Sequence, residues 1–307
     1  MKKIFSFLLT LVIIFTLAAC SSTDKNIDTS KSNQNGSKSK VEKVTPADTP
    51  KEVTIVDGLK VHFIDVGQAD CILIQSGSSN MLIDAGNRND AAKIIQYLKK
   101  NKVSKIDILV ATHPHEDHIG AIDEVIKTFD IGTIYASNAQ TTTQTYKDFI
   151  NAVKNKGLKL TNAVPGADFG FGHTMCTILA PNNSKYDNLN NYSVVIKLVY
   201  ENTSFLFTGD AESLSEGEIL NKGYNISSDV LKIGHHGSTS STSSAFLKKV
   251  NPKYAVISVG HGNDYGHPAA STLTKLNEIG AKVYRTDKNG TIVATSDGTK
   301  ITFTSIP

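Results

Sequence analysis

The chain has 307 residues and a formal net charge of +3 at pH 7, with 39% hydrophobic and 20% charged residues. This length allows a domain with a substantial hydrophobic core. The near balance of charge excludes a strongly basic chain, so there is no overall signal for nucleic-acid binding, although one face could still be basic.

Residues 1–19 are typical of an export signal. Lys2 and Lys3 precede an apolar run that is too short for a comfortable transmembrane span. The LAAC sequence at residues 17–20 resembles the lipobox of bacterial lipoproteins, which implies cleavage before Cys20 and lipidation of its thiol. An ordinary secretory signal with an incidental cysteine is the alternative. Residues 20–52 are polar and mixed in charge, which predicts a disordered tether between a lipid anchor and a folded domain at residues 53–307.

The folded part is expected to begin with strands. Apolar, β-branched runs at residues 61–66 and 71–74 predict a hairpin, and residues 81–83 continue it. A helical pattern and a buried strand follow, and the same order then recurs: helices are expected at residues 91–100, 119–128, 243–249 and 271–279, and strands at 106–110, 194–199, 204–207, 230–233, 254–259, 283–285 and around Gly290 and Gly298. Grouped strands followed by helices predict an α/β fold, an αββα sandwich of two mixed sheets with outer helices.

Four candidate metal ligands lie close together where the strand at residues 106–110 ends. They are His113, His115, Asp117 and His118. Imidazole nitrogens and carboxylate oxygens are ligands that suit zinc and similar metals. Histidines in loops are usually solvated, but this density beside a buried strand favours a metal site.

The HPHEDH sequence at residues 113–118 resembles the HxHxDH signature of the metallo-β-lactamase superfamily. Further motifs narrow the resemblance to the extracytoplasmic hydrolase domain of ComEC-type competence proteins. They are VHFIDVGQ at 61–68, MLIDAG at 81–86, FLFTGD at 205–210, LKIGHHGS at 231–238 and NDYGHP at 263–268. The resemblance covers residues 61 to about 298 and again implies an αββα sandwich.

The resemblance also implies roles for single residues. The metal ligands would be His113 and His115 for a first ion, Asp117 and His118 for a second, Asp210 as a bridge and His235 as a later ligand. The groups implied to act on the substrate are Asp117, His236 and His267. Which of His235 and His236 faces the metal stays open. Asp84 and Asp65 fit either ligand-orienting or turn-capping roles.

One superfamily feature is missing. Many members carry a further metal-binding histidine before the second hairpin, and here Asn191 or Ser193 takes its place. Because an amide is a poorer zinc ligand than an imidazole, the first site could be weak or could favour manganese.

These features predict a metal-dependent hydrolase with one or two zinc ions, or manganese, that cleaves phosphodiesters through metal-activated water. Its expected place is the extracytoplasmic face of the bacterial cytoplasmic membrane, anchored through Cys20, with DNA or another phosphodiester as substrate and no stable protein partner. An ester, lactone or β-lactam hydrolase and a catalytically weak surface DNA-binding protein are the alternatives. Whether Cys71 and Cys176 pair stays open.

Overall fold

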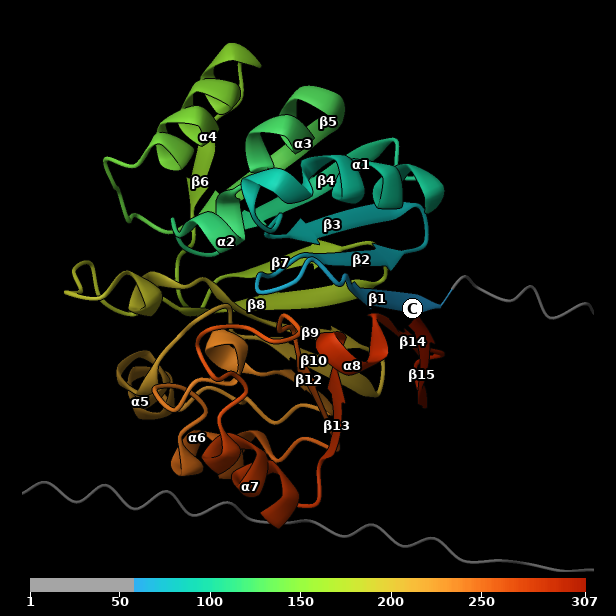
Figure 1. Ribbon diagram of the computed structural model, residues 1–307, viewed down its shortest axis with the longest axis vertical. Coiled ribbons are helices and arrows are strands. Elements are labelled where there is room, and N and C mark those ends of the chain that lie inside the picture. Colours follow the sequence, from blue (N-terminus) through green and yellow to red (C-terminus); the bar gives the residue numbers. More distant parts are fainter. Residues whose placement is uncertain (1–57) are drawn as a thin grey trace, which may run out of the picture. The chain divides into compact units, whose positions relative to one another are not determined.

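The computed structural model describes residues 58–307. The predictions for the signal peptide at residues 1–19, the lipidated Cys20 and the tether up to residue 52 lie outside the described residues. Within residues 58–307, two β-sheets pack face to face, and helices cover the outer face of each sheet (Figure 1). The predicted αββα arrangement is confirmed.

The first sheet has eight strands in the order β15-β14-β1-β2-β3-β4-β5-β6. Neighbours are antiparallel from β15 to β3 and parallel from β3 to β6. The predicted hairpin and the strand that leads into the histidine cluster are both present, as β1, β2 and β4. The strands are β1 Leu59–Phe63, β2 Ile72–Ser76, β3 Ser79–Ile83, β4 Lys105–Ala111, β5 Asp130–Ala136, β6 Leu160–Asn162, β14 Thr291–Ser296 and β15 Ile301–Ile306.

The second sheet has seven strands in the order β13-β12-β11-β10-β9-β8-β7. Its strands are antiparallel from β7 to β10 and parallel from β10 to β13. Parallel strands end at one edge of the sheet, so the loops that follow β10, β11 and β12 gather there. The strands are β7 Asp168–Phe171, β8 Thr174–Ala180, β9 Val195–Tyr200, β10 Thr203–Phe207, β11 Val230–Lys232, β12 Tyr254–Ile257 and β13 Lys282–Arg285.

Helices on the outside complete the layers. The first sheet is covered by α1 Ala91–Lys100, α3 Ile122–Thr128 and α4 Gln144–Asn155, and the second by α5 Ser213–Asn221, α6 Ser244–Val250 and α7 Ala270–Glu278 (Figure 1). The helix expected at residues 119–128 is in fact two helices, because Ala121 leaves the helical conformation between α2 Glu116–Ile119 and α3. Within residues 58–307, none of the helices has the length and apolar character needed to cross a membrane.

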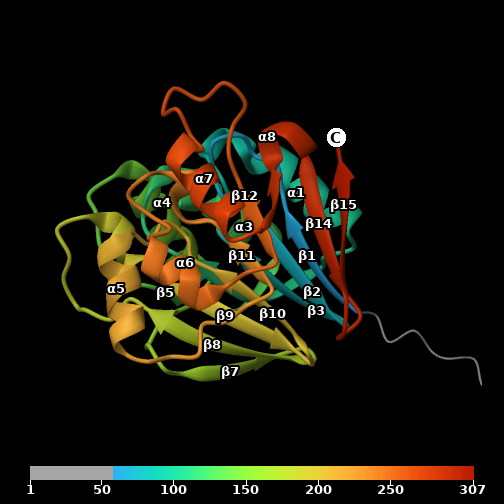
Figure 2. The same cartoon turned by 90° about the horizontal axis from the view of Figure 1, so that it is seen from below.

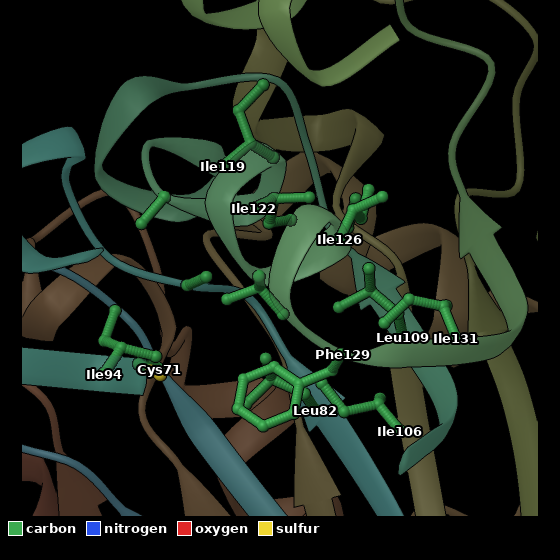
Figure 3. Packing of buried hydrophobic residues seen from close by; sticks show 14 of the residues in the cluster. Cys71, Leu82, Ile94, Ile106, Leu109, Ile119, Ile122, Ile126, Phe129 and Ile131 are labelled. Atoms are coloured by element: carbon green, nitrogen blue, oxygen red, sulfur yellow. The ribbon is translucent and has the colours of Figure 1, made fainter. Parts of the chain in front are cut away.

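Three apolar clusters hold the layers together. One lies between the sheets, and it includes the rings of Phe63, Phe205 and Phe207. Another joins the outer face of the first sheet to its helices, where Ile122 and Ile126 of α3 approach Leu109 of β4 (Figure 3). The third joins the second sheet to α5, α6 and α7. Burying these side chains is the main source of stability for such a domain.

Both described cysteines are buried and free. Cys71 belongs to the cluster under the outer helices, whereas Cys176 belongs to the cluster between the sheets. The two thiols therefore lie in different layers of the sandwich, and the structure does not pair them.

Candidate metal centre

Four chain segments bring polar side chains to one edge of the sandwich. The segment after β4 carries His113 and His115, and the α2 turn that follows carries Asp117 and His118. The loop after β10 supplies Asp210, and the short 3₁₀ turn η3 (Gly234–Gly237) after β11 supplies His236. In both sheets these segments follow the carboxyl ends of strands, so residues far apart in the sequence converge.

The core of the centre is a group of four residues whose potential ligand atoms all lie within 4.8 Å of one another. They are Asp117, His118, Asp210 and His236. His118 Nε2 is 3.3 Å from Asp210 Oδ2, and His236 Nε2 is 3.2 Å from Asp117 Oδ2. Two imidazoles and two carboxylates at this spacing form a donor set suited to zinc or a similar divalent metal.

His113 and His115 lie beside this group. His113 Nε2 is 3.0 Å from His115 Nδ1 and 4.0 Å from Asp210 Oδ2. The His113 and His118 rings are adjacent, with centroids 4.2 Å apart, and both Nε2 atoms are within 4.0 Å of Asp210 Oδ2. A carboxylate that bridges two ions needs this proximity. The structure brings together the predicted ligands of both ions, while their binding of metal stays a prediction.

Hydrogen bonds to the Nδ1 atoms orient the buried imidazoles. His118 Nδ1 is 2.7 Å from Asp84 Oδ2, and Asp84 itself accepts hydrogen bonds from the amide and hydroxyl of Thr112. His236 Nδ1 lies 2.9 Å from the carbonyl oxygen of Ser258, to which it donates. When Nδ1 carries the proton, Nε2 offers a lone pair to the cluster, as a metal ligand needs.

Asp84 and Asp65 have different roles in the structure. Asp84 is fully buried and supports His118. Asp65 accepts a hydrogen bond from the Gly67 amide at 3.1 Å, so its carboxylate caps a turn. Of the two predicted candidates, only Asp84 touches a residue of the centre through its carboxylate.

The electrostatic field of the cluster favours a positive charge. Burial by itself lowers the pKa of His118, but the charges of Asp210, Asp117 and Asp84 outweigh it and hold that pKa well above its ordinary value. For Asp210, burial acts to raise the pKa, yet the imidazoles of His118 and His236 pull it well below its usual range. A cation at this point, a proton or a metal ion, is therefore stabilised.

Unpaired buried atoms show that the cluster fits a metal ion. His118 Nε2 and Asp210 Oδ1 are both buried and have no hydrogen-bond partner within the described part of the chain. Buried polar atoms without partners are costly and uncommon in folded proteins. A metal ion bound at the cluster would satisfy both atoms, and the residues present are the types that bind one.

Both of the paired histidines approach Asp210. His236 is buried, with Nε2 3.7 Å from Asp210 Oδ2, and the His235 side chain is 26% exposed, with Nε2 3.8 Å from the same oxygen and Nδ1 near Ser240 and Glu212. His235 therefore stays a candidate ligand, as expected, and His236 joins it. Both residues have left-handed backbone angles, φ 47° and 52°, so the side-chain directions do not follow those of a regular strand or helix.

Asn191 does not take the place of the missing histidine. Its Oδ1 accepts hydrogen bonds from the amides of Glu212 and Ser215 at the start of α5, so it caps that helix. Ser193, the other candidate, is the residue that reaches the centre. Its Oγ lies 3.3 Å from His113 Nδ1 and accepts a hydrogen bond from the Asp210 amide.

The centre opens into a cavity of about 540 Å³. His267 lines it, as predicted for a histidine at the rim, and its Nδ1 is 3.5 Å from Gln68 Nε2. Tyr265 was not predicted as a site residue, although it belongs to the NDYGHP motif, because only His267 of that motif carries an obvious catalytic group. The cavity is lined by Gln68, Asn87, His115, Glu116, Asp117, Asp210, His235, His236, Tyr265 and His267.

Comparisons with known proteins agree with this geometry. A family model described as the metallo-beta-lactamase superfamily matches residues 64–261. ComE operon protein 3 of Bacillus subtilis (strain 168) is 29% identical to the chain over 251 residues, which cover 76% of the chain and 32% of that relative. Competence protein ComA of Neisseria gonorrhoeae is 32% identical over 230 residues, which cover 74% of the chain and 31% of that relative. The chain therefore spans about a third of the length of these curated relatives.

A solved structure has the same fold. The metallo-beta-lactamase fold protein YhfI from Bacillus subtilis aligns with a TM-score of 0.51 and 16% identity, covering 75% of this chain and 96% of that one. At this identity the similarity concerns the fold alone. The predicted resemblance to ComEC-type competence proteins is confirmed by the sequence relatives.

Proposed function

Because the chain belongs to the metallo-β-lactamase superfamily, we propose that it is a metal-dependent phosphodiesterase that acts on nucleic acid or a related molecule. The observation that carries the proposal is the buried cluster of Asp117, His118, Asp210 and His236 with its unpaired atoms. A bound divalent metal would lower the pKa of water from about 16 toward about 7 and would offset negative charge on a phosphoryl group. The resemblance to competence proteins favours a nucleic-acid substrate.

The protein's own groups prepare the site for a phosphodiester. Asp84 and the Ser258 carbonyl fix the rings of His118 and His236, so that their Nε2 atoms point into the cluster without reorganisation. Most of the cluster is buried, while Asp117 and His115 reach the cavity. A substrate in the cavity therefore meets groups that are already oriented, which is the main contribution a protein makes at such a centre.

His267 is placed to donate a hydrogen bond to an oxygen of the substrate. Gln68 accepts a hydrogen bond from the Gly260 amide through Oε1, so its Nε2 donates toward His267 Nδ1. The neutral ring then carries its own proton on Nε2, the other ring nitrogen. Partial burial lowers the pKa of His267, which favours this neutral form. A neutral histidine at the edge of the cavity can stabilise developing charge on a substrate oxygen through this hydrogen bond.

The decisive experiment compares substrate classes. Purified protein with Zn²⁺ or Mn²⁺ is incubated with a labelled oligonucleotide, a p-nitrophenyl ester and a lactone. We expect metal-dependent cleavage of the oligonucleotide. The rate of cleavage should fall roughly 100-fold or more in His118→Ala and Asp210→Ala. It should be unchanged in the matched control His173→Ala, because His173 lies outside the cluster. Ester or lactone turnover with intact oligonucleotide would instead identify the alternative hydrolase. Oligonucleotide binding without any turnover would identify the DNA-binding alternative.

The same proposal places the enzyme outside the cytoplasmic membrane, held by a lipid on Cys20. Its support is the lipobox-like LAAC sequence at residues 17–20. A Cys20→Ser variant is expected to leave the membrane fraction, whereas Cys71→Ser should remain in it. Equal membrane association of parent and Cys20→Ser would contradict the anchor.

A further inference from the structure

Tyr265 is the most exposed large hydrophobic side chain in the described part of the chain, at 72% of its possible surface. It lies on the loop between β12 and α7, which projects from the domain (Figure 2). The same ring lines the cavity of the metal centre. Exposing an aromatic ring to water is unfavourable, so its place at the entrance to a polar cavity suggests a binding role.

Hydrogen bonds within the loop fix the backbone on both sides of Tyr265. The Asn263 side chain donates from Nδ2 to the carbonyls of Gly260 and His267, and its Oδ1 accepts from the amides of Tyr265 and His267. Gly260 packs so closely that a Cβ there would lie 2.7 Å from the backbone nitrogen of Gln68. The loop is thus tied both to itself and to the segment between β1 and β2, so the backbone that carries Tyr265 is preorganised.

Other rings connect Tyr265 to the centre. The Tyr265 and His267 rings are stacked, with centroids 5.8 Å apart and an interplanar angle of 26°. His267 in turn meets the edge of His235, at 5.6 Å and 74°. Tyr265, His267 and His235 thus form a row of rings. A flat group that stacks on Tyr265 would lie at the outer end of this row, whose inner end is at the metal cluster.

We propose that Tyr265 is a stacking platform for an unpaired nucleobase next to the scissile phosphodiester, so that the substrate is single-stranded nucleic acid. This inference rests on the proposed phosphodiesterase function. Aromatic side chains bind single strands by stacking on successive bases, and they do so with little sequence preference. Bases within a duplex are already stacked on each other and are not available to such a ring. Asn87, which lines the same cavity, has a side-chain amide that can bind the edge of a base.

The test separates stacking from catalysis. The metal-loaded protein is given a single-stranded oligodeoxynucleotide and an oligonucleotide of equal length with abasic tetrahydrofuran sites. In Tyr265→Ala we expect KM for the base-containing strand to rise roughly ten-fold with kcat within about two-fold, which is the scale of one lost base stack. Tyr265→Phe keeps a ring and should behave like the parent. Neither variant should change KM for the abasic strand.

The outcomes distinguish the two proposals. If the parent cleaves both strands and Tyr265→Ala behaves like the parent, or raises KM equally for both strands, stacking is overturned while the phosphodiesterase function stands. Cleavage of neither strand by the parent would overturn both proposals. A blunt duplex cleaved with the KM of the single strand would also contradict the stacking role.

Discussion

The role of Asp84 in orienting His118 can be tested by changing one hydrogen bond. Asp84 is buried, has a left-handed φ of 58° and contacts His118 Nδ1 at 2.7 Å. Asn tolerates the same backbone conformation, so Asp84→Asn changes the charge with little change of shape. We expect this variant to bind Zn²⁺ about 10- to 100-fold more weakly in a competition titration with a chelating dye.

The matched control for this variant is Asp65→Asn. Its carboxylate caps the turn at Gly67, so the affinity for Zn²⁺ should stay within about two-fold of the parent. Equal losses in both variants would show that Asp84 supports the fold and does not orient the ligand.

Protonation of His62, in β1, should make the stability of the protein depend on pH. Burial, helped by the nearby charge of Lys60, lowers the pKa of His62 to about 4, and its Nδ1 contacts the Tyr97 hydroxyl at 2.9 Å. Between pH 6.5 and 4 the unfolded chain takes up this proton and the folded chain does not, so the free energy of unfolding falls as the pH falls. Between pH 7 and 5 the parent should lose about 2 kcal/mol more than His62→Gln, measured by urea unfolding followed by circular dichroism. Parallel profiles would contradict the assignment.

The sequence predicts one part of the metal centre and not another. His113, His115, Asp117 and His118 could be predicted because they crowd one turn after a buried strand. The approach of both His235 and His236 to Asp210 could not, since it depends on two consecutive left-handed residues whose side-chain directions no periodic pattern describes. Backbone angles of this kind are set by tertiary contacts, such as the hydrogen bond from His236 to Ser258.

At the scale of elements, the short helix α2 depends on the small size of Gly120. A Cβ at this position would lie 2.4 Å from the Arg88 backbone nitrogen, because the end of α2 packs directly against the 3₁₀ turn η1 (Arg88–Asp90). We expect Gly120→Ala to lower the free energy of unfolding by about 1–3 kcal/mol, measured by urea denaturation. The variant should also bind Zn²⁺ more weakly, since α2 carries Asp117 and His118.

A second helical glycine serves as the control for size alone. Gly217 lies in α5, and a Cβ added there would meet no other atom within 4 Å. Gly217→Ala should therefore stabilise the protein by about 0.5–1 kcal/mol through helix propensity. Destabilisation of both variants by the same amount would mean that close packing at Gly120 is not the cause.

The strands that the sequence predicts differ in hydrophobic pattern from those that it does not predict. Central strands such as β4 and β9 are mostly apolar, which the sequence shows clearly. The short strands β6 and β7 carry a weaker signal. All three residues of β6 are exposed, and β7 has only four residues, too few for the alternation of its two phenylalanines to be distinctive. Edge strands like these are determined by their neighbours and not by their own sequence.

At the scale of the whole domain, the two sheets are joined by a buried ion pair as well as by apolar packing. Lys232 belongs to β11 of the second sheet, and its Nζ lies 2.8 Å from Asp70 Oδ2, just before β2 of the first sheet. The Asp70 amide also donates to the Asp117 carbonyl at 3.1 Å. The pair therefore connects both sheets with the segment that carries the metal cluster.

Removing one charge of this pair should destabilise the protein more than removing both. Lys232→Met leaves Asp70 as an uncompensated buried charge, and we expect it to lower the free energy of unfolding by about 3–5 kcal/mol. Adding Asp70→Asn removes that charge with almost no change of shape, so the double variant should recover most of the loss and lie within about 2 kcal/mol of the parent. Urea unfolding followed by circular dichroism measures each corner of this cycle. If the double variant is as unstable as the sum of the two single variants, the charges do not interact. The joining of the sheets would then rest on the apolar cluster between them.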